Sequence, residues 1–228
     1  MTKIIFGIFA HPDDEAMGPS GALLQATKNG ANLHLFTLTN GEAGTNPDNL
    51  ENLGDARLKE WHKAGSLLGA TSMQHLGYHD GKLHNQAMIE IGARLVEMIS
   101  QQLQEAPADA EVEFMTLDLN GYTGHIDHIV AARAACFAFY RLKKQDNRLK
   151  RIKFACLPET LYAEDNTNWI FMERGRSPDE ITEVVDAREY REEIIAIINT
   201  HHTQRADGEY TLRTAGDMLG MNYFIVRA

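Results

Sequence analysis

The sequence is poor in cysteine, in long apolar runs and in positive charge, and each shortage excludes a class of protein. Its two cysteines, Cys136 and Cys156, are too few for a disulfide framework or a cysteine-rich zinc site, and both stand in apolar stretches typical of reduced thiols. No apolar run approaches the roughly 18 residues that mark a membrane span. Basic residues number 22 against 32 acidic ones, a net charge of −10, which argues against nucleic acid or anionic membranes as partners.

The amino-terminal run at 4–10 is apolar and follows one basic residue, Lys3, as in a weak secretory signal. It ends in the polar sequence HPDDE at 11–15, which does not suit cleavage by signal peptidase. A buried strand is therefore the better interpretation of this run. We predict a cytoplasmic protein without a membrane anchor.

Short apolar runs alternate with longer amphipathic ones along most of the chain. They predict strands at 4–10, 33–38, 72–76, 112–117, 152–156, 168–173 and 222–227, and helices at 16–28, 55–68, 86–103, 126–142 and 187–199. This alternation is typical of βαβ units, so we expect an α/β fold: a mostly parallel sheet with helices on both faces. The polar segment 201–216 is expected to be irregular. We predict a single domain over 1–228, in which about 151–228 elaborates the sheet and the substrate pocket.

The first polar cluster follows the first predicted strand, where ligands of parallel sheets bind. His11 and Asp14 stand three residues apart across a turn at Pro12, so both can face one point. Imidazole and carboxylate groups are both zinc ligands, and Asp13 between them is placed to meet a metal-bound water. The alternative is that Asp13, Asp14 and Glu15 only complement the dipole of the following helix.

The second polar cluster, GYTGHIDH at 121–128, follows the predicted strand at 112–117 and opens a helix. His125 and His128 share one helical face, and the helix dipole keeps a histidine there neutral and able to bind metal. Asp127 can orient a histidine ring through its second nitrogen. The alternative is a glycine-rich turn with histidines facing solvent. Together the clusters offer two histidines and one aspartate, the number of protein ligands that catalytic zinc commonly keeps.

The motifs AHPDDE at 10–15 and HIDH at 125–128 resemble the two hallmarks of the PIG-L/LmbE-like zinc N-deacetylase family. Weaker similarities at 40–44, 57–60, 76–81 and 201–204 extend the resemblance over essentially the whole chain. The resemblance implies a Rossmann-like fold, Zn²⁺ as cofactor, and removal of an acetyl group from an N-acetylglucosamine-type sugar conjugate.

The same resemblance implies a role for each motif residue. His11, Asp14 and His128 would hold the zinc, and Asp13 would be the general base that takes a proton from the attacking water. His125, protonated and oriented by Asp127, would stabilise the negative charge that builds on the acyl oxygen. Either Asp13 or His125 would then give the leaving amine its proton, and the sequence does not choose between them.

Five further residues are candidates for binding the substrate. Arg57 could contact a sugar hydroxyl or the leaving acetate, Glu42 and Asp80 stand on loops at the expected face, and His201 and Gln204 could close the pocket. Each has a purely structural alternative, as a solvated arginine, a turn residue or part of a helix end.

Two other functions fit the same residues. An identical metal centre would serve an amidohydrolase that acts on a non-sugar N-acyl substrate. A non-catalytic sugar- or nucleotide-binding protein is the second, although no GxGxxG follows the first predicted strand. In each case the expected partner is a small molecule, and the sequence leaves association of the chain with copies of itself open.

Overall fold

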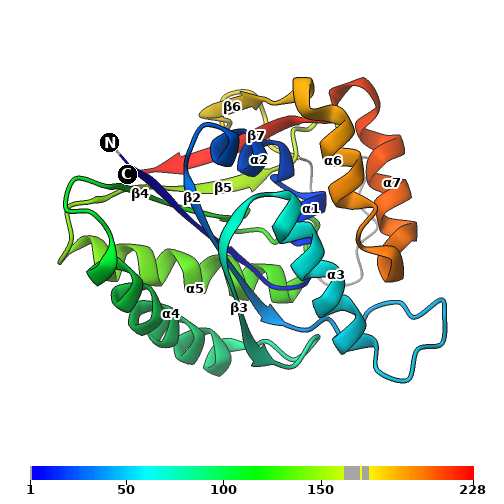
Figure 1. Ribbon diagram of the computed structural model, residues 1–228, viewed down its shortest axis with the longest axis horizontal. Helices are drawn as coiled ribbons and strands as arrows, with labels where there is room; N and C mark the ends of the chain where they lie inside the picture. Colours follow the sequence, from blue (N-terminus) through cyan, green and yellow to red (C-terminus); the bar gives the residue numbers. More distant parts are fainter. Residues whose placement is uncertain (1, 162–169, 171–174) are drawn as a thin grey trace.

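Seven strands form one sheet in the computed structural model, which describes residues 2–161, 170 and 175–228 (Figure 1). Their order across the sheet is β3-β2-β1-β4-β5-β7-β6. The strands are β1 Lys3–Phe9, β2 Asn32–Thr39, β3 Ala70–Tyr78, β4 Glu111–Leu117, β5 Leu149–Cys156, β6 Glu183–Asp186 and β7 Met221–Arg227. The first five in this order pair in parallel, whereas β7 is antiparallel to both β5 and β6. The predicted α/β fold with a mostly parallel sheet is confirmed.

Strand β1 shows why its sequence reads as an unbroken apolar run. Ile4, Phe6 and Ile8 point into one core, whereas Ile5 and Phe9 point into the other. Side chains alternate between the two faces of a strand, so a strand covered on both faces needs apolar residues at successive positions.

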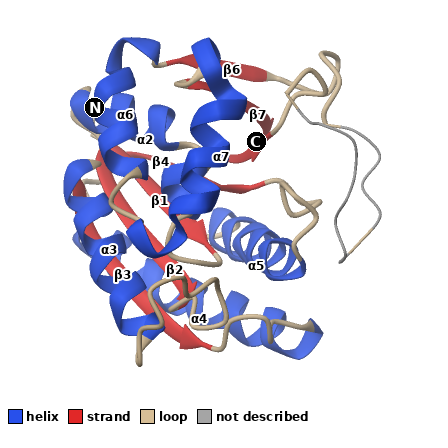
Figure 2. Ribbon diagram, turned by 90° about the vertical axis from the view of Figure 1, so that its right-hand side faces the viewer, coloured by secondary structure: helices blue, strands red, loops and turns tan. Residues whose placement is uncertain are grey.

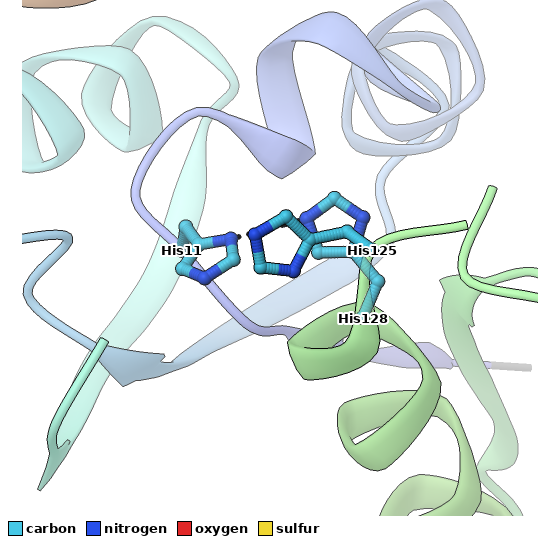
Figure 3. Close-up of side chains that lie close together, drawn as sticks. All are labelled: His11, His125 and His128. Carbon is cyan, nitrogen blue, oxygen red and sulfur yellow. Dashed lines mark hydrogen bonds between the residues drawn. The ribbon is translucent and has the colours of Figure 1, made fainter. Parts of the chain in front are cut away.

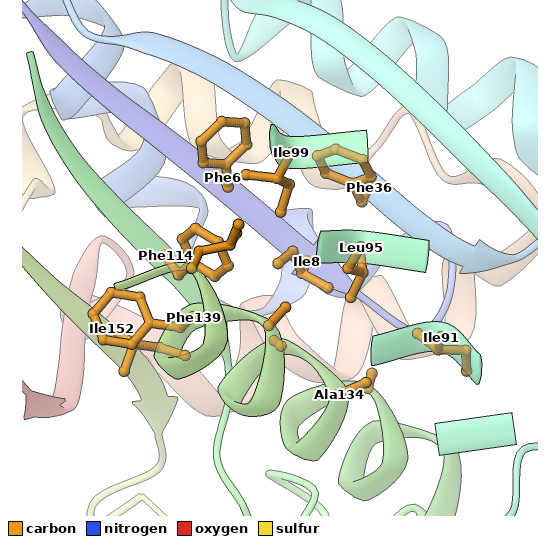
Figure 4. Close-up of a cluster of buried hydrophobic side chains, with 14 of the residues drawn as sticks. Phe6, Ile8, Phe36, Ile91, Leu95, Ile99, Phe114, Ala134, Phe139 and Ile152 are labelled. Atoms are coloured by element: carbon orange, nitrogen blue, oxygen red, sulfur yellow. The ribbon is translucent and has the colours of Figure 1, made fainter. Parts of the chain in front are cut away.

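Helices cover both faces of the sheet (Figure 2). They are α1 Asp14–Met17, α2 Ser20–Lys28, α3 Leu53–Leu67, α4 Asn85–Glu105, α5 Ile126–Lys143, α6 Arg191–Ile198 and α7 Arg205–Ala215, with short 3₁₀ turns at Arg188–Tyr190, His202–Gln204 and Gly216–Met218. Helices α4 and α5 pack on one face, where residues such as Leu95 and Phe139 meet Phe6 and Phe114 of the sheet (Figure 4). Helices α2, α3 and α6 pack on the other face. In the described part of the chain, no helix has the length and apolar character needed to cross a bilayer.

Two predicted elements differ from the structure, one strand was missed, and one prediction falls mostly outside the described residues. The helix expected at 16–28 is two helices, α1 and α2, separated at Gly18-Pro19. The expectation that 201–216 is irregular was wrong, because most of it forms α7, a surface helix whose only buried residue is Gly208 and which therefore lacks an apolar stripe. The four-residue edge strand β6 was missed, and the strand predicted at 168–173 lies outside the described residues except for Ile170.

The strand order reverses at β1. From β1 the chain moves outward to β2 and β3 and then crosses back to β4, on the other side of β1. In open parallel sheets, the carboxyl ends of the strands at such a reversal border a crevice that binds ligands. The motif at 10–15 follows β1 directly, and the motif at 125–128 lies on the loop and helix after β4, so the topology brings them together.

The strand latest in the chain, β7, is an interior strand that lies between β5 and β6. Asn222 of β7 accepts a hydrogen bond from the backbone N–H of Ala22 at 2.7 Å and donates one to the carbonyl of Gly18 at 3.2 Å. Strand β7 therefore also holds the break between α1 and α2, four residues after Asp14.

Candidate active site

The candidate site lies where β1 and β4 end. His11 follows β1 by two residues, and α5, which begins at Ile126, carries His125 at its N-cap and His128 in its first turn. The three imidazole rings face one another, with ring centroids 4.8–5.0 Å apart (Figure 3). The site thus joins segments that are more than 100 residues apart in the sequence.

Three candidate ligand atoms converge at this point. His11 Nδ1 lies 3.0 Å from His128 Nε2, and Asp14 Oδ1 lies 3.1 Å from His128 Nε2 and 4.0 Å from His11 Nδ1. Ligands bound to zinc at about 2 Å in tetrahedral geometry lie about 3.3 Å apart, so the three atoms fit the metal. Alternative groupings of nearby atoms are His11, His125 and His128, or His11, Asp80 and Asp127.

The other polar atoms of His11, Asp14 and His128 are held by the protein. His11 Nε2 lies 2.9 Å from Asp80 Oδ1, and His128 Nδ1 lies 3.0 Å from the carbonyl oxygen of Gly121. With these nitrogens donating, the lone pairs of His11 Nδ1 and His128 Nε2 point to the shared centre. Asp14 Oδ2 accepts the N–H groups of Ala10 and His11. These contacts favour the set His11, Asp14 and His128 over the alternatives, since Asp80 and Asp127 flank the other nitrogen of His11.

The electrostatics of this cluster follow from the close packing of its charged groups. Burial alone would lower the pKa of His11, but the hydrogen bonds with Asp127 and Asp80 and the charge of Asp14 raise it to about 10. Burial alone would raise the pKa of Asp14, but His128 and His11 hold it below its usual range. A metal ion would take the place of the proton on His11 as the positive charge among these carboxylates.

Asp13 stands beside the cluster and is held by Arg57. Its Oδ2 accepts a hydrogen bond from Arg57 Nη2 at 2.7 Å, and the same guanidinium donates to the carbonyl oxygens of Pro12 and Gly41 at 2.8 Å. Burial raises the pKa of Asp13, and the charge of Arg57 limits the rise, so that the pKa is about 6. Arg57 therefore contacts the predicted base, whereas the sequence suggested a contact with substrate.

Asp127 is placed differently from the sequence-based expectation that it orients His125. Its carboxylate accepts the N–H groups of Gly81 and Leu83 and lies 3.5 Å from His11 Nε2. The backbone N–H of Asp127 donates to His125 Nδ1 at 3.1 Å. In the structure its carboxylate thus holds His11 and the loop after β3, and it contacts His125 through the backbone.

Of the candidate substrate residues, Glu42 and Asp80 lie on neighbouring loops and contact each other. Glu42 Oε1 accepts hydrogen bonds from His79 Nδ1 and the backbone N–H of Asp80, while Glu42 Oε2 has no hydrogen-bond partner among the described residues. Both carboxylate oxygens of Asp80 are engaged, one by His11 and the other by the N–H of Ala43.

His201 and Gln204 are buried and bind other parts of the protein. The side-chain N–H of Gln204 donates to the carbonyl oxygen of Thr45, and Gln204 Oε1 accepts a hydrogen bond from the Thr45 hydroxyl. His201 Nε2 lies 2.9 Å from Oε1 of Glu15. Sequence reasoning gave Glu15 no role beyond the helix dipole, although its place in the AHPDDE motif was a signal.

Comparisons with known proteins bear on the fold and the family of this chain. The sequence is 27% identical over 251 aligned positions, covering 92% of this chain and 82% of the relative, to 1D-myo-inositol 2-acetamido-2-deoxy-alpha-D-glucopyranoside deacetylase of Acidothermus cellulolyticus. The fold is similar to that of N,N'-diacetylchitobiose deacetylase from Pyrococcus horikoshii, with a TM-score of 0.68 and 18% identity over 99% of this chain and 82% of that one. It is also similar to that of 4-carboxy-2-hydroxymuconate hydratase from Pseudomonas putida, with a TM-score of 0.72 and 17% identity over 100% of this chain and 97% of that one.

The two structural likenesses show the fold alone, and a hydratase and a deacetylase share it. A sequence model described as PIG-L, GlcNAc-PI de-N-acetylase, matches residues 6–139, which is more than half of the chain. Both motifs lie within the matched region, and the resemblance inferred from them is confirmed: the chain belongs to the PIG-L (GlcNAc-PI de-N-acetylase) family.

Proposed function

We propose that this protein is a zinc-dependent hydrolase that removes the N-acetyl group from a small N-acetylglucosamine-type sugar conjugate. The observation that carries the proposal is the convergence of His11 Nδ1, Asp14 Oδ1 and His128 Nε2, with the carboxylate of Asp13 beside them. The chain's similarity to a deacetylase of an acetamido-sugar conjugate supports the choice of substrate.

His11, Asp14 and His128 would hold the metal, and two imidazoles with one carboxylate suit zinc better than magnesium, which prefers oxygen ligands. When bound, zinc supplies Lewis-acid polarisation of the amide carbonyl and lowers the pKa of water. The contacts of Asp80 and Gly121 with the other nitrogens of the two histidines fix the rings in the orientation that this role needs.

Asp13 is the general base in this proposal. With a pKa of about 6, its carboxylate is mostly ionised at neutral pH, yet it can be protonated during turnover. Asp13 takes a proton from the attacking water as the oxygen of that water bonds to the acyl carbon. The C–N bond then breaks, and the amine nitrogen receives a proton from Asp13, which yields acetate and the free amino sugar.

His125 stabilises the acyl oxygen as a neutral donor. Burial and the neighbouring His128 and His11 lower the pKa of His125 to about 4, so the ring is neutral at neutral pH. Because its Nδ1 accepts the N–H of Asp127, the proton of the neutral ring is on Nε2. We therefore replace the protonated His125 of the sequence-based interpretation with an Nε2–H donor aimed at the developing negative charge.

Glu42 is the candidate substrate residue that the contacts favour most. Its Oε2 is a buried carboxylate oxygen without a hydrogen-bond partner among the described residues, so a sugar hydroxyl could donate to it once the loops around Glu42 admit the substrate. Arg57, Asp80, His201 and Gln204 are already bound by protein groups, so we assign them to support of the site.

The test is acetate release from an N-acetylglucosaminyl inositol, from N,N'-diacetylchitobiose and from a plain N-acetyl alkylamine, before and after chelation. We expect release from a sugar substrate that stops on chelation and returns with zinc. Asp13→Asn should lower kcat about 10²–10⁴-fold with unchanged zinc content, and the exposed Asp109→Asn serves as a matched control.

Other results would point to the other functions. Release from the alkylamine alone would favour an amidohydrolase acting on non-sugar substrates. Zinc and sugar binding without turnover would favour a binding protein. Loss of zinc in Asp13→Asn would make Asp13 a ligand and contradict its role as base.

A further inference from the structure

Glu15 and His201 form a fully buried pair that the mechanism above does not use. Their exposed fractions are 0% and 1%, and His201 Nε2 lies 2.9 Å from Glu15 Oε1. Burying a carboxylate is costly unless it is paired and hydrogen-bonded, and His201 supplies that partner for Oε1. The other oxygen of Glu15, Oε2, accepts the backbone N–H of Asp13 at 3.2 Å.

Asp13 has a backbone conformation that needs such support. Its φ is 128° and its ψ is −24°, in a region that residues with a side chain rarely adopt. A strained backbone of this kind persists only when surrounding contacts hold it. On the carbonyl side, Asp13 accepts the N–H groups of Ala16 and Met17, and its side chain is held by Arg57. Glu15 holds the remaining group, the N–H.

His201 is itself firmly placed by the segment around it. The next residues join two other parts of the site: Thr203 donates its N–H and hydroxyl to Glu60 of α3, and Gln204 binds Thr45 in the loop after β2. His201 therefore links the 200–204 segment to Glu15, and Glu15 in turn holds the N–H of Asp13. This segment lies outside the region 6–139 that matches the family.

We infer that the Glu15–His201 pair is a positioning device that holds the strained backbone of Asp13, and with it the carboxylate, in place for proton transfer. The inference rests on the proposed role of Asp13 as general base. Neither residue touches the substrate in this scheme, because both act through the N–H of Asp13.

The test uses variants of the full chain. Glu15→Leu/His201→Leu removes both groups together, so that no unpaired charge is left buried. His201→Gln keeps an amide N–H where Nε2 of the histidine donates, and should restore the contact. Thr200→Val is the matched control, since its hydroxyl is buried next to His201 but donates only to the carbonyl of Ile197.

Two kinds of measurement separate positioning from simple structural support. We expect the double variant to lose about 10²-fold in kcat per folded, zinc-loaded molecule, with KM unchanged, as a misplaced catalytic group does. His201→Gln and Thr200→Val should stay close to the wild type. In an Asp13→Asn background, the double substitution should have no further effect on kcat, because the pair affects kcat only by positioning the carboxylate that this variant lacks.

The second measurement does not depend on activity: a crystal structure and amide exchange of the metal-free variant. We expect Asp13 to leave its positive φ and its N–H to exchange faster. A double variant whose Asp13 keeps φ near 128°, or whose effect on kcat persists without the Asp13 carboxylate, would overturn the inference. If the wild type hydrolyses none of the amides, the proposed function fails, and the conformation and exchange of Asp13 alone decide whether the pair positions it.

Discussion

Replacing Arg57 should move the pH dependence of catalysis. Arg57 is 3% exposed, and its guanidinium lies 2.7 Å from the carboxylate of Asp13. An opposite charge at this distance stabilises the ionised form of a carboxyl group and typically lowers its pKa by about 1–3 units. In Arg57→Met the charge is removed, so the pKa of Asp13 should rise from about 6 to roughly 7–9.

The sign of the effect on activity follows from the role of the base. The base must be ionised, so kcat/KM falls as the pH drops through the pKa of Asp13. In the wild type this acid limb should lie near pH 6, and in Arg57→Met it should lie about 1–3 pH units higher. At pH 7 the ionised fraction of Asp13 would then fall from about 0.9 to between about 0.5 and 0.01, a loss of roughly 2- to 90-fold.

The assay is kcat/KM for acetate release between pH 5 and pH 9, with zinc content measured in each variant. Arg57→Lys is the matched control. It keeps the positive charge, and with it the acid limb, but one ammonium group cannot reproduce the fork that bonds Gly41, Pro12 and Asp13, so stability should fall. If Arg57→Met raised KM and left the acid limb in place, Arg57 would be a substrate ligand, as the sequence suggested, and the electrostatic reasoning would be refuted.

Three further predictions concern the metal, the oxyanion and the Arg57 pocket. Zinc binding to the metal-free protein at pH 7 should release about one proton, because the pKa of His11 is about 10 without metal. Calorimetry in buffers of different ionisation enthalpy measures the number of protons released. Zinc uptake without proton release would argue against His11 as a ligand. His125→Ala should lower kcat about 10²–10³-fold, and His125→Gln less, because an amide keeps an N–H donor; equal losses in steady-state kinetics would contradict the donor role. Gly41→Ala should destabilise the fold by about 1–3 kcal/mol in urea unfolding. A Cβ at this position would overlap the Arg57 guanidinium, and the φ of 69° is one that residues with a side chain rarely adopt. An unchanged urea midpoint would contradict this and show that the Arg57 pocket adapts.

The sequence alone predicted those elements and contacts that depend on a pattern of neighbouring residues. Apolar runs covered on both faces predict the interior strands, as Ile4, Ile5, Phe6 and Ile8 in β1 illustrate. The motifs at 10–15 and 125–128 also predict that His11 and His128 meet, because both follow parallel strands and such strands end at the same edge of the sheet.

The elements that were missed lack such a pattern. Helix α7 buries only Gly208, so it leaves no apolar stripe in the sequence. Strand β6 has four residues and lies at the edge of the sheet, where pairing with β7 rather than burial defines it.

The partners of the site residues were missed for a different reason. Arg57 and Asp13 are 44 positions apart, His11 and Asp127 are 116 apart, and Glu15 and His201 are 186 apart. These contacts depend on how loops from different strands pack together, and neither residue of a pair carries a local pattern that names the other.

The interior position of β7 has a consequence for how the protein is completed during synthesis. The residues that we propose as metal ligands all precede position 129 and can leave the ribosome long before β7 does. Until β7 emerges, β6 lacks β7, the strand with which it pairs, and the break between α1 and α2 lacks its hydrogen bonds with Asn222. A nascent chain can therefore carry the full ligand set while the helix that begins at Asp14 is still unanchored. Metal bound at that stage would be held before the hydrogen bonds of Asn222 anchor this helix.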